Sequence, residues 1–266
     1  MLITSLQNPS VKNIVKLAKS RERKEQRLFV IEGARELSLA LQSDYIVESV
    51  YVCREMFVKT KYPDVLSGLS PDIVVDISRA VFDKIAYREN SDGVVAIAKP
   101  KPHTLENVRL SGNPFVIVLE AVEKPGNLGA ILRTADAAAV DAVVVCDPQT
   151  DLYNPNVVRS SVGGIFTVQT AICTSEQAAA WLKANNISSY AAELRAAEFY
   201  QNIDFRTPSA IVMGTEADGL TGFWLKNATK RIKIPMRGKI DSLNVSVSAA
   251  VLTFEAMRQR GSRVSL

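Results

Sequence analysis

Three polar turns in this chain adjoin apolar segments, which is how ligand sites on α/β sheets are built. They lie at residues 126–136, 211–220 and 242–252. The second carries two acids, Glu216 and Asp218, between Gly214 and Gly219, directly after an apolar run. Glycine backbone and carboxylates at the carboxyl end of a strand can bind a small polar ligand. The three turns together predict a ligand site on an α/β sheet.

Each turn also has an ordinary structural interpretation. Gly129 and Arg133 are four residues apart, so both lie on one helix face and Arg133 would point at whatever occupies the turn. Alternatively, Arg133 forms a surface ion pair with Asp136 that contributes about 0.2–0.5 kcal/mol. Asn127 and Asn244 are residues that commonly cap helices. Spacing alone leaves the functional and structural interpretations open.

Several common chemistries do not match the sequence. Gly126 and Gly129 form G-x-x-G, whereas a dinucleotide fold needs G-x-G-x-x-G, and no phosphate-binding G-x-x-x-x-G-K-[ST] loop occurs. His103 is the single histidine, which argues against histidine-based triads and zinc sites. The cysteines are odd in number and far apart, so we expect reduced thiols and no metal; they are Cys53, Cys146 and Cys173.

The first thirty residues are strongly basic. Asn8 and Pro9 read as an N-cap and first helical position, and apolar residues then recur at helical spacing up to residue 18. The bases are Lys12, Lys16, Lys19, Arg21, Arg23, Lys24 and Arg27, against Glu22 and Glu25. Such an excess suits a surface that meets phosphates, and it is also the composition of a solvated helix face.

The elements that must position these residues alternate between strand and helix. Strands are expected at 28–31, 46–53, 73–77 and 93–98, and helices at 33–42 and 79–85. Pro100 and Pro102 then disfavour regular structure and mark a boundary. A second series has strands at 115–119, 142–146, 166–170, 189–192, 210–213 and 231–234. Near-continuous apolar strands between helices indicate a mostly parallel sheet covered on both faces.

These patterns predict an α/β protein with a small domain at 1–98, a linker at 99–112 and a larger domain at 113–266. The 266 residues are 47% hydrophobic, which is enough for a sizeable core. No apolar run of about 18 residues and no export signal occurs, so we expect a cytoplasmic protein with no membrane span.

The three turns, in this order and spacing, resemble the three motifs of the SpoU-type RNA 2'-O-ribose methyltransferases, members of the SPOUT superfamily. The matching segments are 127–135, 214–220, and 234–236 with 242–246. Residues 154–164, with Arg159 and Ser160, resemble the family's substrate-side loop. The first hundred residues resemble the RNA-binding domain that often precedes the catalytic domain, which implies RNA contacts by Lys12, Lys16, Arg23 and Arg35.

The resemblance implies a trefoil knot near the C-terminus and S-adenosylmethionine as cofactor. The implied cofactor-binding residues are Met213, Gly214, Gly219, Ile234, Pro235, Met236 and Leu243. The implied catalytic residues are Arg133, Asn127, Glu216, Ser242 and Asn244. Family members act as homodimers packed through the knot, and the implied substrate is RNA, with rRNA favoured over tRNA.

The implied reaction transfers a sulfonium methyl to a ribose 2'-hydroxyl. Because an arginine normally stays protonated, we favour Arg133 as a clamp on the neighbouring phosphate or developing alkoxide over a role as general base. Two alternatives stay open from the sequence: a non-catalytic RNA-binding protein on the same fold, and a SPOUT enzyme that methylates an RNA base.

Overall fold

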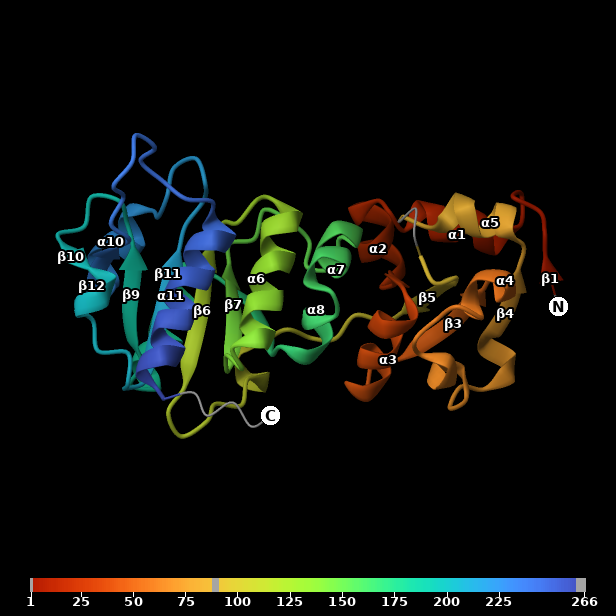
Figure 1. The fold of residues 1–266 in the computed structure, drawn as a ribbon, viewed down its shortest axis with the longest axis horizontal. Helices are drawn as coiled ribbons and strands as arrows, with labels where there is room; N and C mark the ends of the chain where they lie inside the picture. The colour runs from red at the N-terminus through yellow and green to blue at the C-terminus, as the bar shows by residue number, and fades with distance from the viewer. Residues whose placement is uncertain (1, 88–90, 262–266) are drawn as a thin grey trace. The chain divides into compact units, whose positions relative to one another are not determined.

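The computed structural model describes residues 2–87 and 91–261. Both predicted domains, 1–98 and 113–266, therefore include a few residues outside the described ranges. Within these ranges the chain forms two compact units (Figure 1). Unit 1 comprises Met1–Pro102 and Asp151–Thr167, and unit 2 comprises His103–Thr150 and Val168–Leu266. Residues 151–167, which fall inside the predicted larger domain, thus pack with the N-terminal unit. The functional assignment of the domains stays a prediction.

Unit 1 is built on a mixed five-stranded sheet in the order β1-β4-β3-β5-β2. Its strands are β1 (Leu2–Ile3), β2 (Phe29–Glu32), β3 (Val47–Val52), β4 (Val74–Ile77) and β5 (Val94–Ala98). Its helices are α1 (Pro9–Lys16), α2 (Ser20–Gln26), α3 (Ala34–Gln42), α4 (Arg54–Phe57), α5 (Arg79–Ile85), α7 (Pro155–Ser161) and α8 (Gly164–Thr167). Short 3₁₀ turns lie at Pro63–Leu66 and Pro71–Ile73.

The start of α1 is as predicted. The side chain of Asn8 accepts a hydrogen bond from the Ser10 backbone N–H, and Pro9 takes the first helical position. Val11 and Ile14 of this helix are buried in a core with Phe82 of α5. The amphipathic face therefore packs inward and leaves the lysines of α1 exposed.

The strand predicted at 166–170 is wrong. Residues up to 167 belong to α8, and the strand β8 begins only at Thr170. Phe166 packs edge-on against Tyr45, with ring centroids 5.1 Å apart, in an aromatic cluster that also holds Phe29 and Tyr153. Long-range aromatic packing thus overrides the local strand propensity of this run.

Unit 2 is a seven-stranded, all-parallel sheet in the order β10-β12-β9-β11-β6-β7-β8. Its strands are β6 (Phe115–Glu120), β7 (Ala142–Cys146), β8 (Thr170–Cys173), β9 (Ser188–Ala192), β10 (Glu198–Phe199), β11 (Ser209–Met213) and β12 (Lys230–Lys233). Its helices are α6 (Pro125–Ala137), α9 (Ser175–Ala184), α10 (Gly222–Asn227) and α11 (Val245–Gln259), with 3₁₀ turns at Leu105–Asn107 and Tyr200–Asn202.

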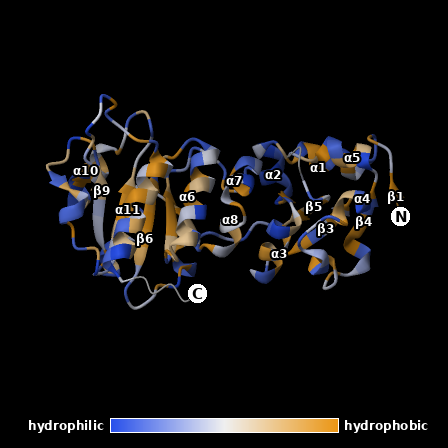
Figure 2. Cartoon of the chain, viewed as in Figure 1, coloured by the Kyte–Doolittle hydropathy of each residue, from blue (hydrophilic) through white to orange (hydrophobic). Residues whose placement is uncertain are grey.

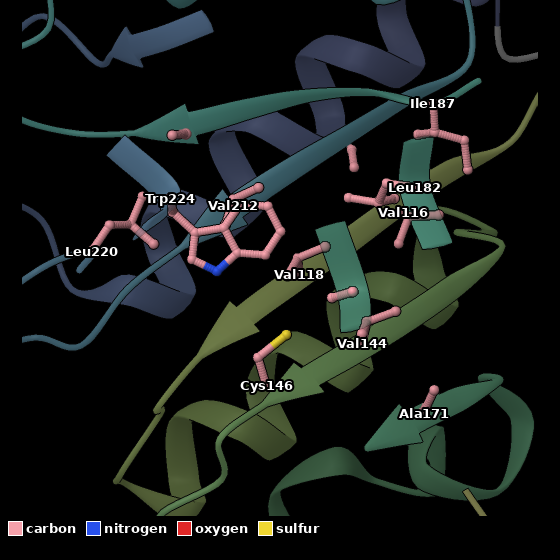
Figure 3. Packing of buried hydrophobic residues seen from close by; sticks show 13 residues of the cluster. Val116, Val118, Val144, Cys146, Ala171, Leu182, Ile187, Val212, Leu220 and Trp224 are labelled. Carbon is pink, nitrogen blue, oxygen red and sulfur yellow. The ribbon is translucent and has the colours of Figure 1, made fainter. Parts of the chain in front are cut away.

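Helices cover both faces of the unit 2 sheet, as predicted from its continuous apolar strands. On one face α6 packs against α11, while α9 and α10 pack together on the other. Val118, Val212 and Trp224 meet in the core under α10 (Figure 3). The inner strand β6, next to the central strand β11, is buried along its whole length and is coloured mostly as hydrophobic in Figure 2.

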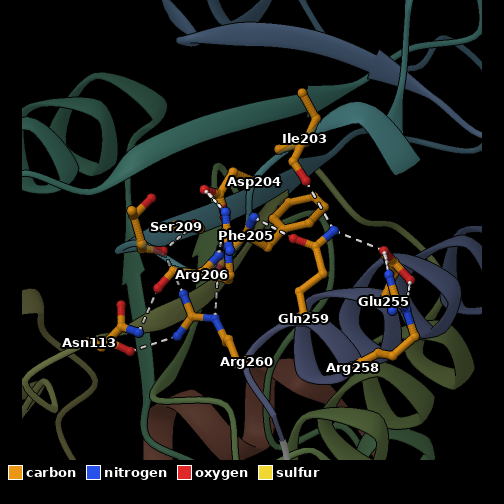
Figure 4. A network of polar contacts seen from close by, with 11 residues as sticks. Asn113, Ile203, Asp204, Phe205, Arg206, Ser209, Glu255, Arg258, Gln259 and Arg260 are labelled. Atoms are coloured by element: carbon orange, nitrogen blue, oxygen red, sulfur yellow. Dashed lines mark hydrogen bonds and ion pairs between the residues drawn. The ribbon is translucent and has the colours of Figure 1, made fainter.

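The end of α11 is fixed by the side chains of Gln259 and Arg260 (Figure 4). They reach the segments that precede β6 and β11, whereas the polar turns follow these strands. Arg260 donates four hydrogen bonds, of 2.6–3.1 Å, to the carbonyl oxygens of residues 113, 114, 205 and 207. Gln259 donates to the Ile203 carbonyl and accepts from the Phe205 N–H. These contacts hold the helix whose other end begins in the third polar turn.

The part of the chain that the structure describes contains no helix long and apolar enough to cross a membrane. It also contains no group of three or more His, Cys, Asp or Glu side chains arranged to hold a metal ion.

Candidate active site

The second polar turn forms a tight loop after β11. The backbone N–H of Thr215 donates to the Gly219 carbonyl at 3.0 Å, and the Gly219 N–H returns a bond of 3.1 Å. Gly219 has φ of +69°, which glycine adopts at little cost. A Cβ on Gly214 would lie 2.2 Å from the Gly219 carbonyl carbon, so the loop folds directly over this position. Only glycine fits there.

Glu216, at the tip of this loop, gathers the other two turns. Its carboxylate accepts hydrogen bonds from the side-chain amide of Asn127, the side-chain amide of Asn244 at 3.0 Å, and the ammonium of Lys124. The Asn244 amide also donates to the Asn127 carbonyl oxygen at 3.2 Å. The carboxylate is 23% exposed, and Lys124 balances its charge. The three turns thus meet at one point, although Asn127 lies 89 residues before Glu216 and 117 residues before Asn244 in the chain.

Asn244 also caps α11, as its position before an apolar helix predicts. Its side-chain oxygen accepts from the Ser246 N–H at 2.9 Å and from the Ser246 hydroxyl at 2.6 Å. With the oxygen held in the cap, the N–H groups of the same amide point toward Glu216 and Asn127. Capping and site construction are therefore two functions of one side chain, and the two interpretations open from the sequence are compatible. Ser242 lies outside this cluster, where its hydroxyl donates to Asp241.

Asn127 is not a helix cap. The helix α6 begins at Pro125 with Lys124 as the N-cap residue, so Asn127 lies in the first turn of the helix. Its side chain is consequently directed at Glu216 rather than at its own backbone.

A pocket of about 680 Å³ lies beside the cluster, at the carboxyl ends of β9, β11 and β12. Among the predicted cofactor-binding residues, Met213, Gly214, Gly219, Ile234, Met236 and Leu243 line it, whereas Pro235 does not. Ser242 and Glu216 also line it. Its volume is in the range of small-molecule sites, and its position is where ligands bind in open parallel sheets.

One wall of this pocket is not among the sequence-based predictions; residues 192–195, after β9, form it. A signal existed in the acidic Glu193, which follows an apolar strand as Glu216 does. Without the strand order, however, nothing places β9 next to β11 and β12.

Arg133 is exposed on α6 and lies outside the polar cluster. Six residues separate it from Asn127, which corresponds to about 9 Å along the helix axis. Among the described residues Arg133 makes no hydrogen bond or ion pair. Its guanidinium is therefore available to a ligand.

The residues predicted to contact RNA lie in unit 1, and their environments differ. Lys12, Lys16 and Arg35 are exposed. The guanidinium of Arg159 lies over the Tyr87 ring, 5.4 Å from its centroid. The hydroxyl of Ser160, which is half-buried, donates to the Asn156 carbonyl within its own helix.

Arg23 is a correction, because it is only 4% exposed. It forms an ion pair of 2.6 Å with Asp151 and donates to the carbonyls of Leu17 and Ala18 at 2.8 Å. A buried arginine with these partners holds α1, α2 and residue 151 together, and it has no surface to offer to RNA.

A buried carboxylate that the sequence did not single out supports the loop. Glu120, at the end of β6, is 3% exposed and accepts hydrogen bonds from the N–H and the hydroxyl of Thr221, at 2.8 and 2.7 Å. It also accepts from Ser175, whose hydroxyl oxygen accepts in turn from the Trp224 indole N–H. Thr221 directly follows the loop of residues 214–220, so this network fixes its far end.

Comparison with known proteins agrees with this geometry. Residues 114–254 match the model of the SpoU rRNA Methylase family. The chain belongs to that family. Residues 8–96 match the MRM3-like substrate binding domain. Unit 2 therefore has the α/β fold of the SpoU family, which is knotted, as the resemblance implied.

Relatives of known activity extend over nearly the whole chain. A 23S rRNA (guanosine(2553)-2'-O)-methyltransferase of Bacillus subtilis is 31% identical over 95% of this chain and 97% of its own length. The crystal structure of an RNA 2'-O ribose methyltransferase is 40% identical, with a TM-score of 0.85 over 98% of this chain and 99% of that one. An AdoMet-bound rRNA methyltransferase from Sinorhizobium meliloti is 29% identical, with a TM-score of 0.87 and the same coverage.

Proposed function

We propose that this protein uses S-adenosylmethionine to methylate a ribose 2'-hydroxyl of 23S rRNA. The observation that carries the proposal is the convergence of Asn127, Glu216 and Asn244 beside the 680 Å³ pocket. The relatives that act on 23S rRNA support the choice of substrate.

The pocket suits the proposed cofactor. Backbone groups of the loop at 214–220 and the apolar side chains of Met213, Ile234 and Leu243 line it, which fits a nucleoside and the methionine chain attached to it. The close approach of the loop backbone over Gly214 leaves no room for a side chain in this wall. When bound, S-adenosylmethionine supplies a sulfonium methyl that is already activated for transfer.

The polar cluster orients groups and does not supply a base in this proposal. Three donors already occupy the carboxylate of Glu216, from Asn127, Asn244 and Lys124. This shared network keeps the starts of α6 and α11 at a fixed separation from the loop. The cluster therefore preorganises the site before RNA binds.

Arg133 acts as the electrophilic clamp. A guanidinium donates and does not accept, and its planar fork matches the oxygens of a phosphate. Because Arg133 is exposed and without a partner among the described residues, it can bind the phosphate next to the target ribose or stabilise the developing alkoxide. Ser242, in the pocket wall, completes the proposed site.

Unit 1 docks the RNA through its exposed basic side chains. Lys12, Lys16 and Arg35 contribute charge, and Arg159 over Tyr87 contributes a stacked cation. The hydroxyl of Ser160, next to Arg159 in the same helix, contributes a polar contact to the RNA.

We also propose that two copies pair through the outer face of α11. Val247 and Phe254 are 47% and 51% exposed, and Leu243, just before the helix, is 40% exposed. Val247 and Phe254 are seven residues apart and so share one face of α11, which a partner would remove from water. Light scattering should give the mass of a dimer for the wild type and of a monomer for Phe254→Asp. The control Val58→Asp, which alters an exposed residue of unit 1, should stay dimeric.

Methyl transfer to a 23S rRNA transcript tests the activity. The product should resist alkaline hydrolysis at one ribose, Arg133→Ala should lose turnover, and its affinity for S-adenosylmethionine should stay within about twofold of the wild type. Arg133→Lys should not restore turnover, because a point charge does not replace the planar fork. Arg109→Ala, at another exposed arginine of unit 2, is the matched control.

The outcome also separates the alternative functions. A methyl group found on a base would favour the other SPOUT branch, and RNA binding with no transfer would favour a non-catalytic protein. Turnover by Arg133→Ala at the wild-type rate would refute the role of the arginine.

A further inference from the structure

Glu193 follows β9 immediately and lies at the carboxyl edge of the unit 2 sheet. Its backbone N–H donates to the Ile232 carbonyl at 2.9 Å, which extends the pairing of β9 with β12 by one residue. Its own carbonyl accepts from the Ala196 N–H at 3.2 Å, where the chain turns away. Both backbone groups are satisfied, so the position of the side chain is well fixed.

One carboxylate oxygen of Glu193 lacks a hydrogen bond. Among the described residues, Oε2 is buried and no donor satisfies it, although the side chain as a whole is 19% exposed. The nearest opposite charge is Nη1 of Arg231, at 3.5 Å. Buried polar atoms in proteins are nearly always hydrogen-bonded, so a single unsatisfied acceptor calls for a donor.

Glu193 lines the pocket already described. Its neighbours there include the apolar Leu194, Ile232 and Met213, in a wall that carries both polar and apolar side chains. A polar group in a small-molecule pocket commonly fixes the orientation of a ligand.

We propose that Glu193 binds the ribose hydroxyls of the nucleoside cofactor, and so selects it; this rests on the proposed function. A carboxylate at the carboxyl end of a parallel strand is a suitable partner for a vicinal diol, because its two oxygens can accept from two neighbouring hydroxyls.

The charge environment favours hydroxyl donors over the cofactor's ammonium group. Arg231 already supplies a positive charge at ion-pair distance, so Glu193 needs a hydrogen-bond donor and not a second cation. Neutral hydroxyls satisfy the oxygen without leaving an excess of positive charge in the wall.

Calorimetry with S-adenosylhomocysteine tests this without any turnover. Glu193→Ala should weaken binding by about 10- to 100-fold, which is the usual effect of losing hydrogen bonds to a charged group. The same loss is expected with 5'-methylthioadenosine, which keeps the ribose and lacks the amino acid. With the 2'-deoxy and 3'-deoxy forms of S-adenosylhomocysteine the effect of the substitution should shrink, because one of the two partners is already gone.

Two further variants serve as controls. Glu193→Gln keeps one carbonyl oxygen, so it should bind more tightly than Glu193→Ala while its ligand-free melting temperature matches the wild type. Glu198→Gln removes a carboxylate on strand β10, beyond β12, that does not line the pocket, and its affinity should not change.

Three outcomes would overturn the inference. Equal affinities of the wild type and both Glu193 variants would exclude any contact. A loss that disappears with 5'-methylthioadenosine would assign Glu193 to the ammonium group. An undiminished loss with both deoxy ligands would exclude the hydroxyls. Failure of the wild type to bind S-adenosylhomocysteine at all would instead refute the proposed function, and this inference with it.

Discussion

Substitution of Gly214 by alanine tests how the close packing of the loop at 214–220 contributes to cofactor binding and to the stability of the protein. The new Cβ would lie 2.2 Å from both the carbonyl carbon and the oxygen of Gly219 and 2.4 Å from the Leu220 nitrogen. Carbon atoms in contact normally lie about 3.5–4.0 Å apart, so the backbone at 219–220 would have to retreat by more than about 1 Å.

This movement has a calculable cost. It would break the paired Thr215–Gly219 hydrogen bonds of 3.0 and 3.1 Å, at about 0.5–1.5 kcal/mol each. Overpacking adds about 1–3 kcal/mol. We therefore expect about 2–6 kcal/mol in total, divided between the free energy of unfolding and the free energy of cofactor binding. If the loop yields, most of this cost appears as a loss of affinity of roughly 30- to 20,000-fold.

Two other glycines calibrate the measurement. Gly219→Ala meets no atom within 4 Å but imposes φ of +69° on alanine, so it should cost about 1–2 kcal/mol. Gly222→Ala, at the start of α10, also meets no atom and lies in a helix, so it should be neutral or slightly stabilising.

The assays are urea denaturation and calorimetry with S-adenosylmethionine, performed on all three variants. The reasoning is refuted if Gly214→Ala both unfolds and binds the cofactor like Gly222→Ala.

Four further outcomes are expected. Asn244→Asp should retain the helix cap and the stability of the wild type but lose at least tenfold in turnover, because a second carboxylate would face Glu216. Asn244→Ala should lose turnover as well, and urea denaturation should show a further loss of about 1 kcal/mol in stability because the cap is removed. Neutralising three exposed lysines of unit 1 to glutamine should reduce the slope of log affinity for duplex RNA against log salt by up to about 3, and an unchanged slope would show that they do not contact phosphate; they are Lys12, Lys16 and Lys19. Iodoacetamide at pH 7 should modify Cys173 before the other cysteines, because the Cys146 thiol donates a hydrogen bond to the Cys173 sulfur and lowers the pKa of Cys173. Mass spectrometry of the peptides would contradict this if Cys53 or Cys146 reacted first. A chelator should leave cofactor affinity unchanged in calorimetry, since no metal-ligand cluster occurs among the described residues.

The lysine variants are preferable to deletion of residues 1–98. Unit 1 includes Asp151–Thr167, and in its core the rings of Phe29 and Tyr153 pack in a tilted arrangement, with 4.2 Å between their centroids. A truncated chain would lose the partners of these residues, so a change in its RNA binding would not report on charge alone.

Sequence by itself determined the features that depend on neighbouring residues. Local chemistry, which depends only on residues close in the chain, accounts for three of these features. They are the Asn8 and Asn244 caps, the apolar strands of the parallel sheet and the close turn at Gly214. The three motifs also identified the family, because the match required only residue types and spacing.

Tertiary structure alone decided which of these residues meet. Asn127 and Asn244 are 117 residues apart, and the strand order that joins them at Glu216 is not encoded in any local pattern. Distant partners likewise turned Arg23 into a buried ion pair, and they placed Glu193 in a pocket wall with an unsatisfied oxygen. Local propensity acts over a few residues, whereas burial and hydrogen-bond partners are set by contacts between distant segments, and those contacts decide what each side chain can bind.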